Sequence, residues 1–125
     1  MGQPQLPLDP FPHVPDPRSR ALALGVTDGN YVYVLALTGV LHVLPDGPHL
    51  HPKILGLAQP VLYAGDLRIT NGKICDVTNL SGTFQFDDAQ GLLEVARALE
   101  ALGFVVEPAA VRFFPTDGST PLVLR

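Results

Sequence analysis

Three of the four histidines, His42, His49 and His51, lie close together in the sequence. In an extended segment, His49 and His51 would point to the same face, because side chains alternate along a strand. With His42 they would supply the three protein ligands of a metal site. Histidines are also common near turns, and Asp46 is the only carboxylate at ligand spacing. We therefore expect neither a metal nor a cofactor, and we keep His49 and His51 as candidate binding residues.

A second polar group, Ser81-Gly82-Thr83, is followed by Phe84 and precedes a predicted helix. Backbone N–H groups near a helix start, together with two hydroxyls, could hold an anion. The favoured alternative is a tight turn that Ser81 and Thr83 stabilise and in which Gly82 supplies the unusual backbone angles. Ser81, Gly82, Thr83 and Phe84 remain candidate binding residues.

The more readable catalytic motifs are missing from the sequence. It has no nucleophile-elbow serine, no phosphate-binding loop and no dinucleotide fingerprint. Cys75 is the only cysteine, so no internal disulfide or cysteine-based zinc site can form. Asp87 and Asp88 lie at a predicted helix start, where negative charge complements the helix dipole. The sequence favours a protein without catalysis and leaves an enzyme as the weaker alternative.

Composition and charge limit the classes of partner. The chain has 125 residues, of which 46% are hydrophobic and 16% charged, and a formal net charge of −4. The length and apolar fraction fit one folded domain. Scattered basic residues and a negative net charge argue against nucleic-acid binding and against an anionic membrane surface. No apolar run is long enough to span a membrane and no signal peptide is recognisable, so we expect a cytoplasmic protein.

Proline content divides the chain into two parts. Residues 1–20 contain six prolines, which prevent a helix or a central strand. This segment is predicted to be an extended arm, either an unstructured tail or a strap that packs on its own domain or on a partner. Residues 21–125 are predicted to form a single domain.

The pair Asn71-Gly72 is the clearest local signal. It suits a two-residue type I′ turn, because both central residues need a positive φ. In that hairpin Ile69 pairs with Ile74, but Asp76 falls on the apolar face opposite Leu67. We therefore expect the strand to fray or bulge near Asp76.

The main helix is predicted over residues 87–102. Asp87 is the expected N-cap, Gln90 has the spacing of a capping box, and Gly103 lies where a glycine ends a helix. Apolar runs predict strands at residues 31–37, 40–44, 59–64, 66–70, 73–78, 104–106, 111–114 and 121–124. The expected fold class is α+β, with an antiparallel sheet of two hairpins plus C-terminal strands and one helix packed on it.

The order of these motifs resembles a module with an SGHY-type loop. That module occurs in the C-terminal region of plant IQ-motif calmodulin-binding proteins and in some bacterial toxin-like proteins. The resemblance rests on Tyr31 to Leu44, His51 to Gly56, Ala64-Gly65, Asn71 to Ile74, Ser81 to Phe84 and the helix 87–102. The histidine and tyrosine of the family loop are Thr83 and Phe84 here, and two family serines are Pro52 and Lys53. The resemblance thus implies a site that has lost most of its polar groups, and the calmodulin-binding segment lies outside the module.

We therefore expect a non-catalytic module that binds another protein or itself, in a bacterial effector or toxin–immunity setting. The alternative is a small enzyme or ligand-binding domain with a pocket between the His49–His51 segment and the Ser81–Phe84 loop. A third hypothesis is a structural subunit that completes its sheet with a neighbour through residues 120–124.

Overall fold

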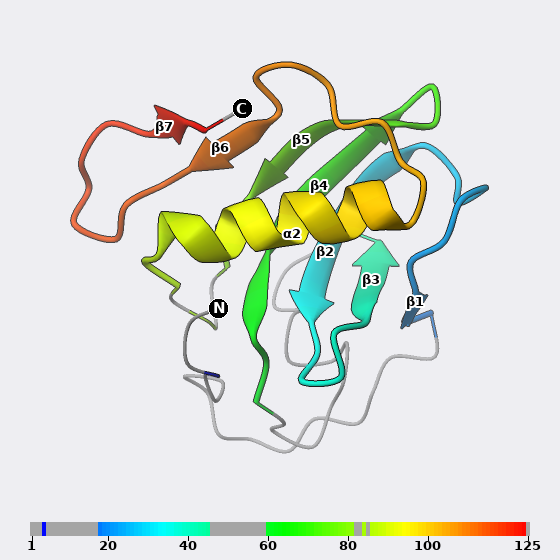
Figure 1. Ribbon diagram of the computed structural model, residues 1–125, viewed down its shortest axis with the longest axis horizontal. Coiled ribbons are helices and arrows are strands. Elements are labelled where there is room, and N and C mark those ends of the chain that lie inside the picture. Colours follow the sequence, from blue (N-terminus) through cyan, green and yellow to red (C-terminus); the bar gives the residue numbers. More distant parts are fainter. Residues whose placement is uncertain (1–3, 5–17, 46–59, 82–83, 85, 125) are drawn as a thin grey trace.

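The computed structural model describes residues 4, 18–45, 60–81, 84 and 86–124. These residues form an α+β fold, as predicted, in which the helix α2 (Ala89–Ala101) packs on one face of a sheet (Figure 1). The strands in chain order are β1 (Arg20–Ala21), β2 (Gly29–Leu35), β3 (Leu41–Pro45), β4 (Tyr63–Thr70), β5 (Lys73–Thr78), β6 (Val111–Phe113) and β7 (Leu122–Val123).

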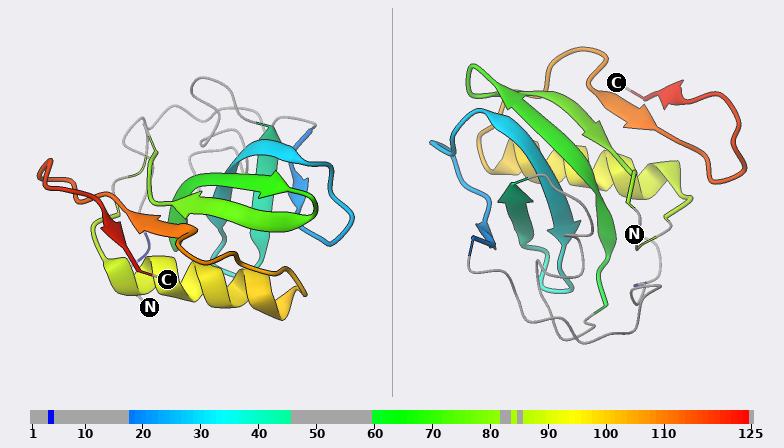
Figure 2. Two further views of the ribbon diagram at one scale, coloured as in Figure 1. Left: turned by 90° about the horizontal axis from the view of Figure 1, so that it is seen from above. Right: turned by 180° about the vertical axis from the view of Figure 1, so that it is seen from behind.

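The strand order across the sheet is β1-β3-β2-β4-β5-β6-β7. All neighbouring pairs are antiparallel except β5 and β6, which are parallel. The sheet is thus mostly antiparallel, as expected, and the pairing of β5 with β6 is the exception. It arises because α2 carries the chain across the sheet between β5 and β6, and a parallel pair needs such a long crossover (Figure 2).

The hairpin of β4 and β5 turns at Asn71-Gly72, as predicted. Both residues have positive φ, at 53° and 72°, as a type I′ turn requires. The Asp28 carboxylate holds the turn, because its oxygens accept hydrogen bonds from Asn71 N at 2.7 Å and Gly72 N at 3.0 Å. Ile69 pairs with Ile74, which confirms the expected register at this end.

A bulge follows at the predicted place. The register shifts next to Arg68, so Asp76 lies opposite Arg68 and Leu67 lies opposite Val77. The predicted pairing of Asp76 with Leu67 is therefore wrong. The one extra residue in β5, Cys75, moves the Asp76 carboxylate from the apolar face to the polar face.

The helix is shorter at its start than predicted. Its N-cap is Asp88, whose Oδ2 accepts a hydrogen bond from Gly91 N at 3.0 Å. Asp87, the predicted cap, instead accepts a bond from the backbone N–H of Thr116 at 3.0 Å. The side chain of Gln90 donates a hydrogen bond to Glu94 on the exposed surface of the helix, so it does not form the predicted capping box.

The apolar stripe and the C-terminal end of α2 agree with the sequence. The predicted stripe, Leu92, Val95, Ala96 and Leu99, is buried. Gly103 has a φ of 101°, and the N–H groups of Gly103 and Phe104 bond back to the carbonyls of Glu100 and Leu99. This pattern closes the last turn of the helix and confirms Gly103 as its stop signal.

The remaining strand predictions are less accurate. Residues 104–106 form only an isolated bridge between Val106 and Ile74, and residues 63–70 form one strand rather than two. The C-terminal strand β7 lies at an edge of the sheet, as expected. Strand β1 begins at Arg20, while the rest of the proline-rich arm falls outside the described residues except for Pro4 and residues 18–19. No helix in the described part of the chain has the length and apolar character needed to cross a membrane.

Strands β4 and β5 approach each other closely at Gly65. A Cβ atom there would lie only 1.8 Å from the carbonyl oxygen of Thr78. Tyr33 lies opposite Gly65 on β2 and donates its hydroxyl to that same carbonyl at 2.7 Å. Complete burial raises the pKa of Tyr33, so the hydroxyl stays protonated and remains a donor. Gly65 therefore allows β2, β4 and the end of β5 to meet in the core.

Replacing Gly65 with alanine should strongly destabilise the fold, because the new methyl group overlaps the Thr78 carbonyl. We expect the free energy of unfolding to fall by about 3 kcal/mol or more. Gly118 is the control, because its φ is +81° but a Cβ added there would have no atom within 4 Å. Gly118→Ala should cost about 1 kcal/mol, from the left-handed backbone alone. Equal losses in chemical denaturation would contradict the close approach at Gly65.

Candidate functional site

The predicted binding residues are only partly placed by the structure. His49, His51, Gly82 and Thr83 lie outside the described residues, so the expected pocket between the two segments is not tested. Ser81 is half-buried, and its Oγ accepts a hydrogen bond from Phe84 N at 3.1 Å. The turn predicted for Ser81, Gly82 and Thr83 stays a prediction, because two of its three residues are not described.

Phe84 belongs to the hydrophobic core, with only 1% of its surface exposed. Its ring lies beside that of Phe86, at 6.3 Å between centroids, and Phe86 stacks on Tyr63 at 4.7 Å. Phe84 and Phe86 also line a pocket of about 170 Å³. Its lining residues are Asn79, Leu80, Ser81, Phe84, Phe86, Phe114, Pro115 and Thr116.

Asn79, another lining residue of this pocket, joins three segments through its side-chain amide. Its Nδ2 donates to the carbonyls of Phe86 and Phe114, both at 2.8 Å, and its Oδ1 accepts from Phe114 N at 2.7 Å. Asn79 is only 5% exposed, so these bonds are shielded from water. The amide is thus committed to the fold and holds the end of β6 against the segment before α2.

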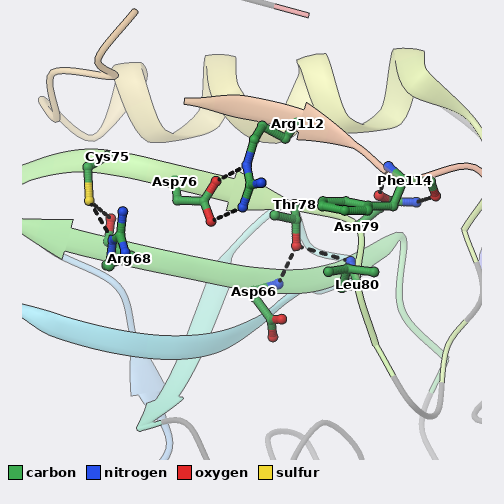
Figure 3. A network of polar contacts seen from close by, with 9 residues as sticks. All are labelled: Asp66, Arg68, Cys75, Asp76, Thr78, Asn79, Leu80, Arg112 and Phe114. Atoms are coloured by element: carbon green, nitrogen blue, oxygen red, sulfur yellow. Dashed lines mark hydrogen bonds and ion pairs between the residues drawn. The ribbon is translucent and has the colours of Figure 1, made fainter. Parts of the chain in front are cut away.

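A polar network crosses strands β4, β5 and β6 on the face opposite the helix (Figure 3). Arg112 forms two bonds of 2.7 Å with the carboxylate of Asp76, and its guanidinium lies 5.2 Å from the centre of the Phe114 ring. The hydrogen bond to Asp76 raises the pKa of Arg112. Planar pairing of this kind orients both side chains, so the network fixes β6 beside β5.

Cys75 lies in the same network, at the bulge. Its Sγ is 3.1 Å from Nε of Arg68 and 3.2 Å from Oγ1 of Thr70. The hydrogen bond to the sulfur raises the pKa of Arg68. These contacts do not form the nucleophile and base pair that covalent catalysis needs, because neither partner is a general base. No three His, Cys, Asp or Glu side chains among the described residues are grouped as a metal site would require.

An apolar groove lies between the C-terminal end of α2 and the turn that joins β2 to β3. It has a volume of about 250 Å³. The lining residues are Leu22, Gly39, Val40, Leu41, Ala98, Ala101 and Leu102, none of which is charged. Val40 and Leu102 stay 42% and 40% exposed at its rim. Leu24, which is 57% exposed, lies against Gly103 just beyond the helix.

Sequence reasoning missed the groove, because its lining comes from three separate parts of the chain: the residue after β1, the β2–β3 turn and the helix end. Two features of the sequence could have indicated the groove. Val40 lies beside a turn and Leu102 at the helix end, and both are apolar residues at positions that are usually exposed. Comparison of the chain with protein families, with curated proteins and with solved structures found no match. The resemblance to the SGHY-type module therefore stays a prediction.

His42 is the one histidine of the predicted cluster within the described residues. It lies in β3 opposite Val34 and Ala21, and it is half-buried. Partial burial lowers the pKa of its imidazole below the usual 6.5, because it disfavours the charged form.

Protonation of His42 should therefore oppose folding. The unfolded chain binds this proton more readily, so the free energy of unfolding should fall as the pH drops below about 6.5. His42→Gln should flatten this part of the stability curve, measured by urea denaturation at a series of pH values. An unchanged slope in the variant would assign the effect to other groups.

Removing the Asn79 amide should destabilise the protein. Asn79→Ala leaves Phe114 N and the carbonyls of Phe86 and Phe114 without this partner, at an expected cost of about 3 kcal/mol. The control is Asn30→Ala in β2, an exposed asparagine, which should change stability by about 0.5 kcal/mol or less. Denaturant midpoints of the two variants measure the difference, and similar midpoints would contradict this role for Asn79.

Proposed function

We propose that this chain is a non-catalytic protein-interaction module that binds an apolar segment of a partner protein in the groove beside α2. The observation that carries the proposal is the uncharged apolar groove, whose rim residues Val40 and Leu102 remain substantially exposed. Exposed apolar surface around a hollow is typical of interaction sites, because burying it removes that surface from water.

The lining defines the chemistry of the partner. It is made of aliphatic side chains, alanines and a glycine, so it offers no charged group that a polar ligand would need. The volume suits one or two large apolar side chains, which act as anchors in many interfaces. A partner segment with leucine, methionine or an aromatic residue at its centre fits these properties.

The polar side chains favour binding over catalysis. Asn79, Asp76 and Arg112 all bond within the fold. The thiol of Cys75 contacts an arginine and a threonine, neither of which can act as its base. A cytoplasmic location and a bacterial effector or toxin–immunity setting are part of the same proposal. They rest on the sequence resemblance and on the single cysteine, which is compatible with a reducing compartment.

A peptide-display selection against the intact protein tests the groove. We expect wild-type protein to enrich peptides with large apolar anchors and Val40→Glu to lose most of this binding, because a carboxylate at the rim would have to be desolvated. Leu80→Glu is the matched control, since Leu80 is also 42% exposed but lines the other pocket. It should bind like wild type.

The same selection separates the competing functions. Peptides that survive Val40→Glu but are lost with Leu80→Glu would move the site to the pocket beside Ser81 and favour the ligand-binding alternative. If no peptide is enriched above a blank surface, the groove is not a peptide-binding site and the proposal is wrong.

A further inference from the structure

The last strand of the sheet, β7, has an exposed edge. It pairs with β6 on one side, and no strand of the described chain follows it in the sheet (Figures 1 and 2). Its two residues, Leu122 and Val123, are 51% and 61% exposed. Such an edge presents backbone hydrogen-bonding groups to any further strand.

The hydrogen bonds of β7 show which groups face outward. Leu124 N donates to Val111 O at 2.8 Å, so the backbone polar groups of Leu124 point toward β6. These groups alternate in direction along a strand, and those of Val123 therefore point away from the sheet. Pro121 takes the preceding outward position and has no N–H. Among the described residues of this edge, the donor available for pairing is thus the N–H of Val123.

We propose that a second copy of this chain pairs with β7, antiparallel and around a two-fold axis centred on Val123. In this arrangement the Val123 residues of the two copies exchange their N–H···O=C bonds, as an antiparallel hydrogen-bonded pair does. The two sheets then continue into one another. The inference is independent of the groove, because it uses a different surface and a different partner.

The composition of the edge favours a second copy as the occupant. Residues 119–124 carry no charge, so two copies can meet there without placing like charges side by side, although each chain has a net charge of −4. Val123 shares a face with Arg112, its partner across β6 and β7, and that guanidinium is already paired with Asp76.

The other edge of the sheet is less suited to pairing. Strand β1 carries the exposed Arg20 and follows Arg18, and charged residues discourage edge-to-edge association. Pairing of β1 with β7 would also be head to tail and would extend without limit unless its rotation closed a ring, whereas pairing of β7 with itself closes as a dimer. The contact between the β7 strands of two copies is short compared with stable interfaces, which bury about 1,600 Å². The dimer is therefore weak.

Sedimentation equilibrium of the full chain over a concentration series tests the inference. We expect wild type to show a monomer–dimer equilibrium with a Kd between about 0.1 and 1 mM. Val123→Pro removes the outward N–H without touching a bond to β6 and should raise the Kd at least tenfold. Val123→Thr keeps the N–H and the branched side chain, so it should dimerise like wild type. Circular dichroism checks that both variants fold.

Three outcomes would overturn the inference. The first is a monomeric mass for wild type throughout the series. The second is an equal Kd for wild type and a folded Val123→Pro variant. The third is loss of the dimer in Val40→Glu, which would place the second copy in the groove instead of at β7. Peptide binding that depends on Val40 is measured in a separate experiment. If the dimer is not found, the proposed function is therefore not contradicted.

Discussion

The close approach of Gly65 to Thr78 is the constraint on which the rest of this structure depends. Any side chain at position 65 would collide with the Thr78 carbonyl, and Tyr33, which pairs with Gly65 from β2, donates its hydroxyl to that same carbonyl. The end of β5 is therefore fixed against the two central strands. The next residue, Asn79, then ties the segment before α2 to the end of β6. The absence of a side chain at Gly65 thus determines where the chain leaves β5.

The helix is positioned by a second close contact of the same kind. Gly91 faces Tyr63, and a Cβ at Gly91 would lie 2.5 Å from the Tyr63 ring. The first turns of α2 can therefore lie close to β4. The last turn then comes beside the β2–β3 turn, where Ala98, Ala101 and Leu102 form one wall of the apolar groove. The groove depends on the position of the helix. It also depends on the small side chains of Ala98 and Ala101, which leave space that larger side chains would fill.

The two proposed interaction surfaces lie on different parts of the sheet. The groove involves the β2–β3 turn and the end of α2, whereas β7 lies at the far edge beyond β6 (Figure 1). The paired side chains of Asp76 and Arg112 join β5 to β6. They therefore also support β7, the edge strand that pairs with β6. Because the surfaces share no residue, a partner in the groove and a second copy at β7 do not compete for the same atoms.

The sequence by itself determined the features that depend on near neighbours. Asn71-Gly72 specifies its turn through backbone angles, the stripe from Leu92 to Leu99 specifies the buried helix face, and Gly103 ends the helix. Only the tertiary structure decided which aspartate caps α2, because Asp87 bonds to Thr116, a residue distant in sequence. The same holds for Phe84, which was a candidate binding residue and lies in the core. Backbone angles and periodicity are local, whereas burial and hydrogen-bond partners depend on segments that only folding brings together.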